Sequence, residues 1–153
     1  QLGVKDENIK EGITRIRSIA RLQEIKSGKL KNICKDNRLY LDGSHNPLGA
    51  KALNEYLNTH DCKKHLILGM MSNKDHEEYL SKFDNISSIT TIDIPNQPNA
   101  ISGEELKKKL NKYPNINYKK SIEEALDSIN PGKDDLIMIT GSLYLAGELL
   151  NLN

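Results

Sequence analysis

The chain has 153 residues, the size of one ordinary domain and enough to bury a hydrophobic core. Its 22 lysines and arginines nearly balance 21 aspartates and glutamates, and no basic stripe with interleaved aromatic residues points to nucleic acid as a partner. Cys34 and Cys62 lie far apart without a CxxC motif, so neither a zinc site nor a disulfide framework is indicated. A reducing, cytoplasmic location is therefore expected, and no apolar run is long enough to span a membrane.

The first forty residues differ in pattern from the rest of the chain. Residues 5–16 are predicted as a short helix. Two short segments follow, 21–25 and 31–34, separated by a turn at Ser27-Gly28. We expect these two segments to form an antiparallel meander at one edge of a sheet.

Three short apolar runs each lead through a turn into helical periodicity: 39–41, 66–68 and 136–139. Because both faces of these runs are apolar, they are typical of parallel strands that helices cover on both sides. Two further strands are predicted at 89–92 and 116–118, each followed by a helix whose start carries a capping box (Ser102 with Glu105, and Ser121 with Glu124). This alternation predicts an α/β domain with a mainly parallel sheet.

In such sheets, ligands bind beyond the carboxyl ends of the strands. Three turns fall there: 42–46, 69–75 and 141–144. Each turn leads into a helix N-terminus, where free backbone N–H groups and the helix dipole favour an anion. The three turns are therefore the candidate binding site.

The first turn, Asp-Gly-Ser-His-Asn-Pro, is explained only in part by helix capping. Asn46 is a good N-cap and Pro47 suits the first helical position. Asp42 and His45 have no role in a cap, and we favour a function for them. An Asp at the end of a buried strand is well placed to accept hydrogen bonds from ribose hydroxyls or to orient a neighbour. The turn is not a Walker A loop, because it lacks the terminal Gly-Lys-Ser/Thr.

The other two turns leave two interpretations open for each candidate. Asp75 is expected to be an N-cap, whereas Lys74 is a cation at a helix N-terminus and suggests a compensating anion, such as a substrate carboxylate. An ordinary exposed lysine is the alternative. Ser142 is either a plain N-cap or, with the helix amides and the Tyr144 hydroxyl, a holder of a small polar ligand. Arg21 by itself is equally well an ordinary charge on an edge strand.

Four motifs in this order resemble one protein family: Arg21-Leu22-Gln23, LDGSHNPLGA at 41–50, ILGMMSNKD at 67–75 and TGSLYLAGELL at 140–150. Together they resemble the C-terminal domain of folylpolyglutamate synthase/dihydrofolate synthase, within the Mur-ligase-like superfamily. The resemblance covers nearly the whole chain, and Asp-Gly-Ser-His-Asn-Pro is its most specific element.

The resemblance implies a Rossmann-like, three-layer α/β domain with an antiparallel edge near the N-terminus. It also implies a partner, an N-terminal ATPase domain that carries a P-loop. In this family ATP phosphorylates a carboxylate of a folate or dihydropteroate-type substrate, and the amino group of L-glutamate attacks the acyl phosphate to form an amide. Mg²⁺ serves the phosphoryl transfer. The active site lies in the cleft between the two domains.

The resemblance also implies roles for individual residues. Arg21 and Asp42 are expected to contact the nucleotide, and His45 is expected on the glutamate and acyl-phosphate side as the catalytic candidate. The residues expected to hold the incoming glutamate are Lys74, Ser142 and Tyr144. No metal ligand is predicted in this chain.

Two positions depart from the family pattern. The family usually has Trp-Pro-Gly before the arginine, where this chain has Ser18-Ile19-Ala20. The family often has a basic residue where this chain has Asn99.

No Gly-Lys-Ser/Thr phosphate loop occurs in the chain. We therefore expect a single domain, residues 1–153, of a longer enzyme, inactive alone, with ATP and Mg²⁺ bound mainly by the N-terminal ATPase domain. Two alternatives remain: a Mur-type ligase domain that adds an amino acid to a cell-wall precursor, and a stand-alone, non-catalytic binding domain. The histidine in Asp-Gly-Ser-His-Asn-Pro favours the folate branch.

Overall fold

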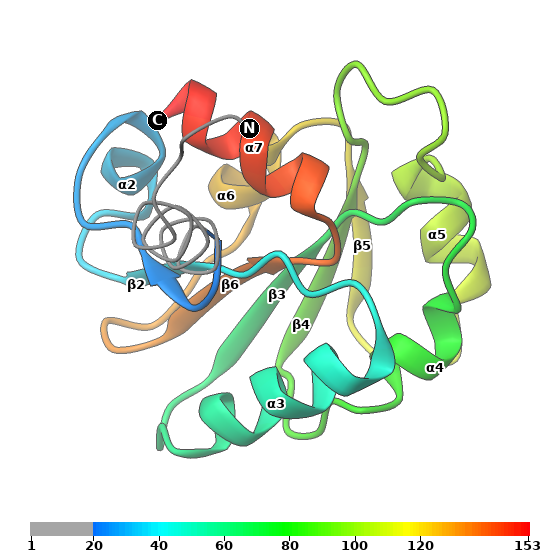
Figure 1. Ribbon diagram of the computed structural model, residues 1–153. Coiled ribbons are helices and arrows are strands. Elements are labelled where there is room, and N and C mark those ends of the chain that lie inside the picture. The colour runs from blue at the N-terminus through cyan, green and yellow to red at the C-terminus, as the bar shows by residue number, and fades with distance from the viewer. Residues whose placement is uncertain (1–19) are drawn as a thin grey trace, which may run out of the picture.

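In the computed structural model, which describes residues 20–153, six strands form one sheet in the order β1-β2-β6-β3-β4-β5 (Figure 1). Neighbouring strands are parallel, apart from the antiparallel pair β1 and β2. The mainly parallel sheet with an antiparallel edge near the N-terminus is therefore confirmed. The strands are β1 (Gln23–Glu24), β2 (Arg38–Leu41), β3 (Lys64–Leu68), β4 (Ser88–Ile92), β5 (Ile116–Lys119) and β6 (Leu136–Thr140).

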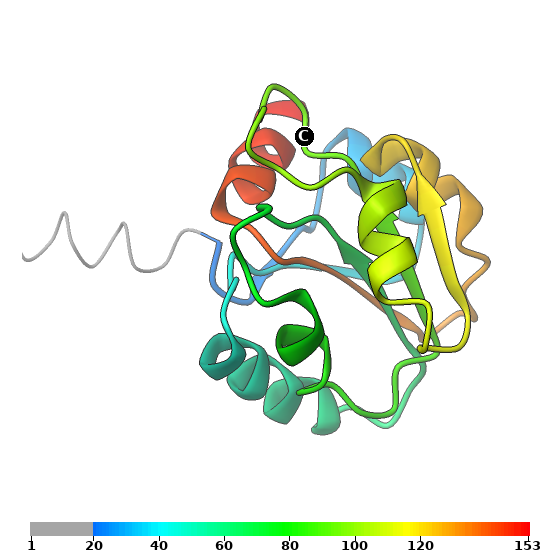
Figure 2. The same cartoon turned by 90° about the vertical axis from the view of Figure 1, so that its right-hand side faces the viewer.

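Helices cover both faces of this sheet, and Figure 2 shows α3 and α7 on opposite sides of it. One hydrophobic cluster joins the sheet to α2, α6 and α7, and a second joins it to α3, α4 and α5. The three-layer arrangement is thus as predicted. The helices are α2 (Lys29–Cys34), α3 (Pro47–Asn58), α4 (His76–Leu80), α5 (Gly103–Lys109), α6 (Ile122–Ser128) and α7 (Leu143–Leu152).

The central strands β3 and β6 are buried along their whole length. Successive side chains of a strand point to opposite faces, so each apolar run supplies both clusters. In β3, for example, Ile67 belongs to the cluster with α7, whereas Leu66 and Leu68 belong to the cluster with α3. This explains why the runs are apolar at every position.

The predicted helix caps are present. The Asn46 side chain accepts a hydrogen bond from the Gly49 N–H (2.9 Å), with Pro47 as the first helical residue. Asp75 accepts from the Glu78 N–H in the same way (2.9 Å). Both predicted capping boxes are also seen, from Ser102 to Glu105 and from Ser121 to Glu124. Side-chain caps therefore start α3, α4, α5 and α6, and a fifth is described below for α7.

The prediction of a strand at 31–34 is wrong, because these residues belong to helix α2. Leu30 and Cys34 are four residues apart and both are buried, as on one face of a helix. Only the first segment of the expected meander pairs with the sheet, as β1. The predicted helix at 5–16 lies outside the described residues.

Within residues 20–153, no helix is both long and apolar enough to cross a membrane.

Candidate functional site

The three predicted turns meet because β6, the last strand in the chain, lies between β2 and β3. Their backbones are bonded to one another. The Gly141 N–H donates to the Ser44 carbonyl (3.1 Å), and the Gly69 N–H donates to the Thr140 carbonyl (3.2 Å). The turns after β2, β6 and β3 thus form one continuous surface at the carboxyl edge, the edge at which the parallel strands end.

A buried group of hydroxyls lies beneath this surface. Tyr79 of α4 is fully buried, and its hydroxyl donates to the Ser44 carbonyl (3.1 Å). The same oxygen lies 2.8 Å from Thr140 Oγ1 and 3.1 Å from Ser44 Oγ. Burial raises the pKa of Tyr79 to about 12, although the hydrogen bonds with Ser44 and Thr140 act in the opposite direction. The phenol therefore keeps its proton and remains a donor near neutral pH.

The turns enclose a pocket of about 520 Å³. Four of the six predicted site residues line it: His45, Lys74, Ser142 and Tyr144. The sequence patterns thus located residues that are far apart in the chain and share one cavity. The other lining residues are Met71, Ser72, Asn73, Asn99 and Leu143.

Two of these four side chains, His45 and Lys74, present nitrogen atoms to the pocket. His45 Nδ1 lies 3.1 Å from the Gly43 carbonyl. Since a carbonyl only accepts, Nδ1 donates to it, and Nε2 is the ring nitrogen that has no hydrogen-bond partner among the described residues. The ammonium of Lys74, within the described part of the chain, has no ion pair or hydrogen bond with a protein group. The pocket therefore combines an unpaired cation with a ring nitrogen.

Ser142 and Tyr144 differ in how they face the pocket. Ser142 is 2% exposed, and its Oγ accepts the Tyr144 N–H (3.1 Å), so it caps α7. Tyr144 is 55% exposed. The prediction that Ser142 is an N-cap is therefore confirmed. The exposed Tyr144 hydroxyl is the more accessible of the two to a ligand.

Asp42 and Arg21 lie outside the lining of this pocket. Asp42 is buried, and its two carboxylate oxygens accept the N–H groups of Leu22 (3.0 Å) and Ser44 (2.8 Å). The Gly43 N–H also donates to the Ala20 carbonyl (2.6 Å). Asp42 thus fastens the segment that carries Arg21, an exposed side chain, to the first turn.

That segment has an unusual backbone. Ala20 has φ of 60° and Leu22 has φ of 47°, in the left-handed region that favours glycine. Each such residue costs about 1–2 kcal/mol. Ala20 occupies the position where the resembled family usually has glycine. The turn before Arg21 therefore keeps a glycine-type conformation although the glycine itself is replaced.

A fourth segment, which was not among the predicted turns, also contributes to the pocket: the loop after β4. The backbone carbonyl of Asn99 accepts hydrogen bonds from the Ser72 N–H (2.9 Å) and the Ser72 hydroxyl (2.8 Å). Met71 and Ala100 form an isolated antiparallel bridge next to this contact. The available signal was the position of β4, because its loop opens at the same edge of the sheet as the three predicted turns.

The described residues do not fit a metal site. Among residues 20–153, no group of three or more His, Cys, Asp or Glu side chains is arranged to hold an ion. Of the two acidic side chains on the turns, Asp42 already accepts two backbone N–H groups and Asp75 caps α4. No step of the chemistry below is therefore assigned to a metal bound by these residues.

Comparison with known proteins identifies the family to which the sequence is similar. Residues 21–143 match the family described as "Mur ligase, glutamate ligase domain". The probable bifunctional folylpolyglutamate synthase/dihydropteroate synthase of Haloferax volcanii is 27% identical over 128 residues, which are 79% of this chain and 15% of that protein.

Solved structures share the fold. The folylpolyglutamate synthase of Thermotoga maritima has a TM-score of 0.73 at 23% identity, over 98% of this chain and 34% of that one. A bifunctional folylpolyglutamate synthase/dihydrofolate synthase with Mn, AMPPNP and L-glutamate bound has a TM-score of 0.70 at 20% identity, over 99% of this chain and 35% of that one. The chain thus spans about a third of each of these structures and 15% of the curated relative.

Proposed function

Because the chain belongs to the Mur ligase, glutamate ligase domain family, we propose that it is the C-terminal domain of an ATP-dependent ligase that adds L-glutamate to folate. The resemblance to the C-terminal domain of folylpolyglutamate synthases, predicted from four motifs, is confirmed. The observation that carries the proposal is the pocket at the carboxyl edge, where His45 and the unpaired Lys74 meet the start of α7.

In this proposal the pocket holds the incoming L-glutamate. Lys74 pairs with one of its carboxylates, and the exposed Tyr144 hydroxyl donates to the same substrate. The chemistry requires an amine to be held against an acyl phosphate, so the main contribution of these residues is positioning. His45 lies on the acyl-phosphate side, where its Nε2 accepts a proton either from the glutamate ammonium, so that the neutral amine can attack, or from the amine nitrogen as it attacks.

Arg21 and Asp42 act together on the nucleotide side. The position of Asp42 at the end of a buried strand is compatible with two roles: a contact with ribose hydroxyls, or the orientation of a neighbour. Its bonds to the Leu22 and Ser44 amides support the second role. We assign the nucleotide contact itself to the Arg21 guanidinium, which is exposed and suits phosphate oxygens.

The surface around the pocket supports a second domain as the partner. Exposed apolar side chains gather on the turns of this edge, and such patches mark interaction sites. They are Leu22 (37% exposed), Leu48 (80%), Leu143 (56%) and Tyr144 (55%). We propose that an N-terminal ATPase domain covers them, supplies most of the site for ATP and Mg²⁺, and binds the folate or dihydropteroate-type substrate. The complete enzyme is assigned to the cytoplasm, consistent with two free cysteines in the described chain.

The test compares the chain alone with the chain joined to the ATPase domain of a folylpolyglutamate synthase. With folate, L-glutamate, ATP and Mg²⁺, the joined protein is expected to release ADP in a coupled assay and the chain alone is not. In the joined protein, Lys74→Met should raise the KM for L-glutamate, and Lys51→Met on the exposed face of α3 is the matched control. Turnover by the chain alone, or a cell-wall precursor replacing folate as the required substrate, would refute the proposal.

A further inference from the structure

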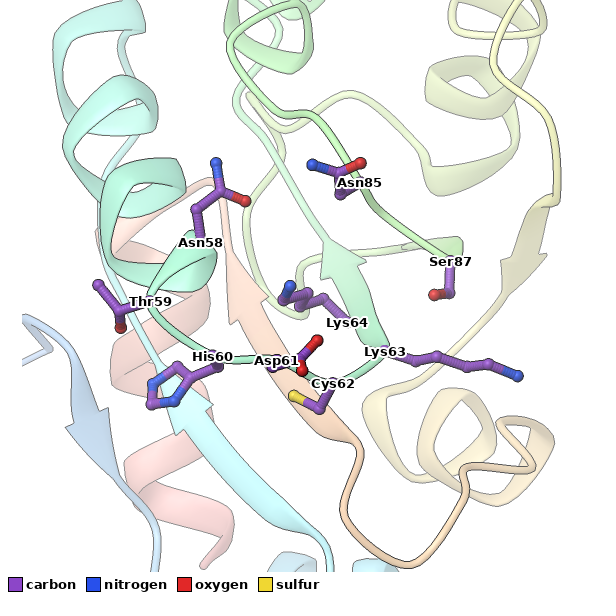
Figure 3. Close-up of a pocket in the computed structure, with 9 residues that line it drawn as sticks. All are labelled: Asn58, Thr59, His60, Asp61, Cys62, Lys63, Lys64, Asn85 and Ser87. Carbon is purple, nitrogen blue, oxygen red and sulfur yellow. The ribbon is translucent and has the colours of Figure 1, made fainter.

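Two pockets of the domain differ in the charge of their walls. One, of about 660 Å³, lies at the amino edge of the sheet, where α3 ends and β3 begins, and its lining includes Asp61, Lys63 and Lys64 (Figure 3). The pocket at the carboxyl edge is different. Among its described lining residues, Lys74 is the one Lys, Arg, Asp or Glu side chain. The proposed glutamate site therefore offers a single permanent positive charge.

L-Glutamate has two carboxylates, so one of them meets an uncharged group in this pocket. Several polar groups of the wall are already bonded within the protein. Oγ of Ser142 accepts the Tyr144 N–H (3.1 Å), and the Ser72 hydroxyl donates to the Asn99 carbonyl (2.8 Å). Asn99 itself is exposed, and its side-chain carboxamide has no hydrogen bond with another described residue. That carboxamide is therefore available to a ligand.

The backbone of Asn99 is fixed at the pocket wall. Its carbonyl accepts both the N–H (2.9 Å) and the hydroxyl of Ser72, and the next residue, Ala100, forms the antiparallel bridge with Met71. These contacts fasten the loop after β4 to the turn that carries Lys74. A contact from Asn99 thus requires the ordering of one short side chain only, which keeps the entropic cost of binding low.

A carboxamide selects weakly between a carboxylate and another carboxamide. Its NH₂ group donates to either of them, and its carbonyl oxygen also accepts from the NH₂ group of a carboxamide. A guanidinium only donates, and it pairs with a carboxylate through two parallel hydrogen bonds. The side chain at position 99 therefore sets how strongly this wall of the pocket prefers a carboxylate.

On the basis of the proposed function, we propose that Asn99 is a specificity-determining residue, through which the pocket accepts L-glutamine as well as L-glutamate. Lys74 holds the α-carboxylate, which both amino acids have. Asn99 contacts the end of the substrate side chain, which is a carboxylate in one amino acid and a carboxamide in the other. The two bind with similar affinity, because the permanent charge meets the group that they share.

The test measures kcat/KM for both amino acids, by ADP release, in the chain joined to the ATPase domain of a folylpolyglutamate synthase. L-Glutamate should exceed L-glutamine by less than about tenfold, since one charge-assisted hydrogen bond distinguishes them. Asn99→Arg should raise this ratio by about threefold or more, the effect of one added ion pair. Asn111→Arg, at an exposed position outside the pocket, is the matched control and should leave the ratio unchanged. Lys74→Met should weaken both amino acids by a similar factor.

Salt gives a second readout, which a change in folding would not move. Raising the ionic strength should reduce the gain in Asn99→Arg, because screening weakens an exposed ion pair. With L-glutamate turned over, three results each overturn this inference alone: a larger ratio in the unmodified protein, a ratio that Asn99→Arg leaves unchanged, or a gain that salt does not reduce. The absence of ADP release with either amino acid refutes the proposed function, and this inference with it.

Discussion

The phenolic oxygen of Tyr79 lies 2.8 Å from Oγ1 of Thr140, and this contact ties α4 to the end of β6 beneath the pocket at the carboxyl edge. The same oxygen is bonded to Ser44 in the first turn. One buried hydroxyl therefore holds two of the turns that shape the pocket, although Tyr79 itself does not line it.

Tyr79→Phe should lower the free energy of unfolding by about 1–2 kcal/mol, because it leaves the part-buried Ser44 carbonyl and the buried Thr140 hydroxyl without this partner. Urea denaturation measures the change. Tyr144→Phe is the matched control, since that phenol is exposed, and it should shift stability by less than about 0.5 kcal/mol. Equal effects of the two substitutions would contradict the role given to the buried hydroxyl.

Gly141→Ala should destabilise the domain by about 2 kcal/mol or more, because Gly141 has φ of 109° in the region that favours glycine. An added Cβ would also lie 2.6 Å from the Gly69 carbonyl oxygen. Gly147→Ala is the control within α7, where an added Cβ meets nothing within 4 Å. It should stabilise the helix by about 0.5–1 kcal/mol. Thermal unfolding separates the two, and opposite signs are the expected result.

Asp42→Asn should cost about 1–3 kcal/mol, because a carboxamide presents an NH₂ group to one of the two backbone amides that Asp42 now binds. Amide hydrogen exchange should speed up at Leu22 and Ser44, the two donors. Asp36→Asn, at an exposed position, should leave both rates unchanged. If the exchange rates at both amides stay the same in Asp42→Asn, Asp42 does not fasten the Arg21 segment.

Asp135 should make stability depend on pH in the acid range. Burial acts to raise its pKa, but the hydrogen bond from the Gly132 N–H (2.6 Å) and the contact with His65 (3.3 Å) outweigh it, and the folded pKa is lowered. Such a carboxylate stabilises the fold fully above its ordinary pKa of about 3.9, and this contribution is lost as pH falls through the lower folded value.

The measurement is urea denaturation of the chain and of Asp135→Asn between pH 6 and pH 3. The difference in stability should be largest at pH 6 and should shrink below the ordinary carboxyl pKa of about 3.9. Asp134→Asn, at an exposed neighbouring position, should follow the unmodified chain throughout. A difference that grows toward low pH would show that the sign of the pKa shift is wrong.

Much of the fold could be predicted because its signals are local. Apolar runs such as 66–68 and caps such as Asn46 and Asp75 depend on neighbouring residues only. Helix α2 was missed for the same reason: six residues give too short a pattern to separate helix from strand. Its helical state depends on the burial of Leu30 and Cys34 in the cluster that also includes α6, which local sequence does not reveal.

The candidate site likewise has features that local sequence predicts and features that depend on residues far apart in the chain. The turns that end at the carboxyl edge were predictable from strand positions, and they brought His45 and Lys74 into one pocket. The buried hydroxyl of Tyr79 was not predictable, because its partners are 35 and 61 residues away in the chain. Nor was the double use of the Asp42 carboxylate, one of whose donors is 20 residues away.

The strand order also sets when the domain can fold. Strand β6 lies between β2 and β3 and pairs with both, yet it is the last of the six strands in chain order. Until Leu136–Thr140 has left the ribosome, β1 and β2 on one side and β3, β4 and β5 on the other share no bond within the sheet. A nascent chain stalled before β6 therefore exposes two unpaired strand edges, which are sites for aggregation. The two parts of the sheet can therefore pair only once β6 is available to lie between them.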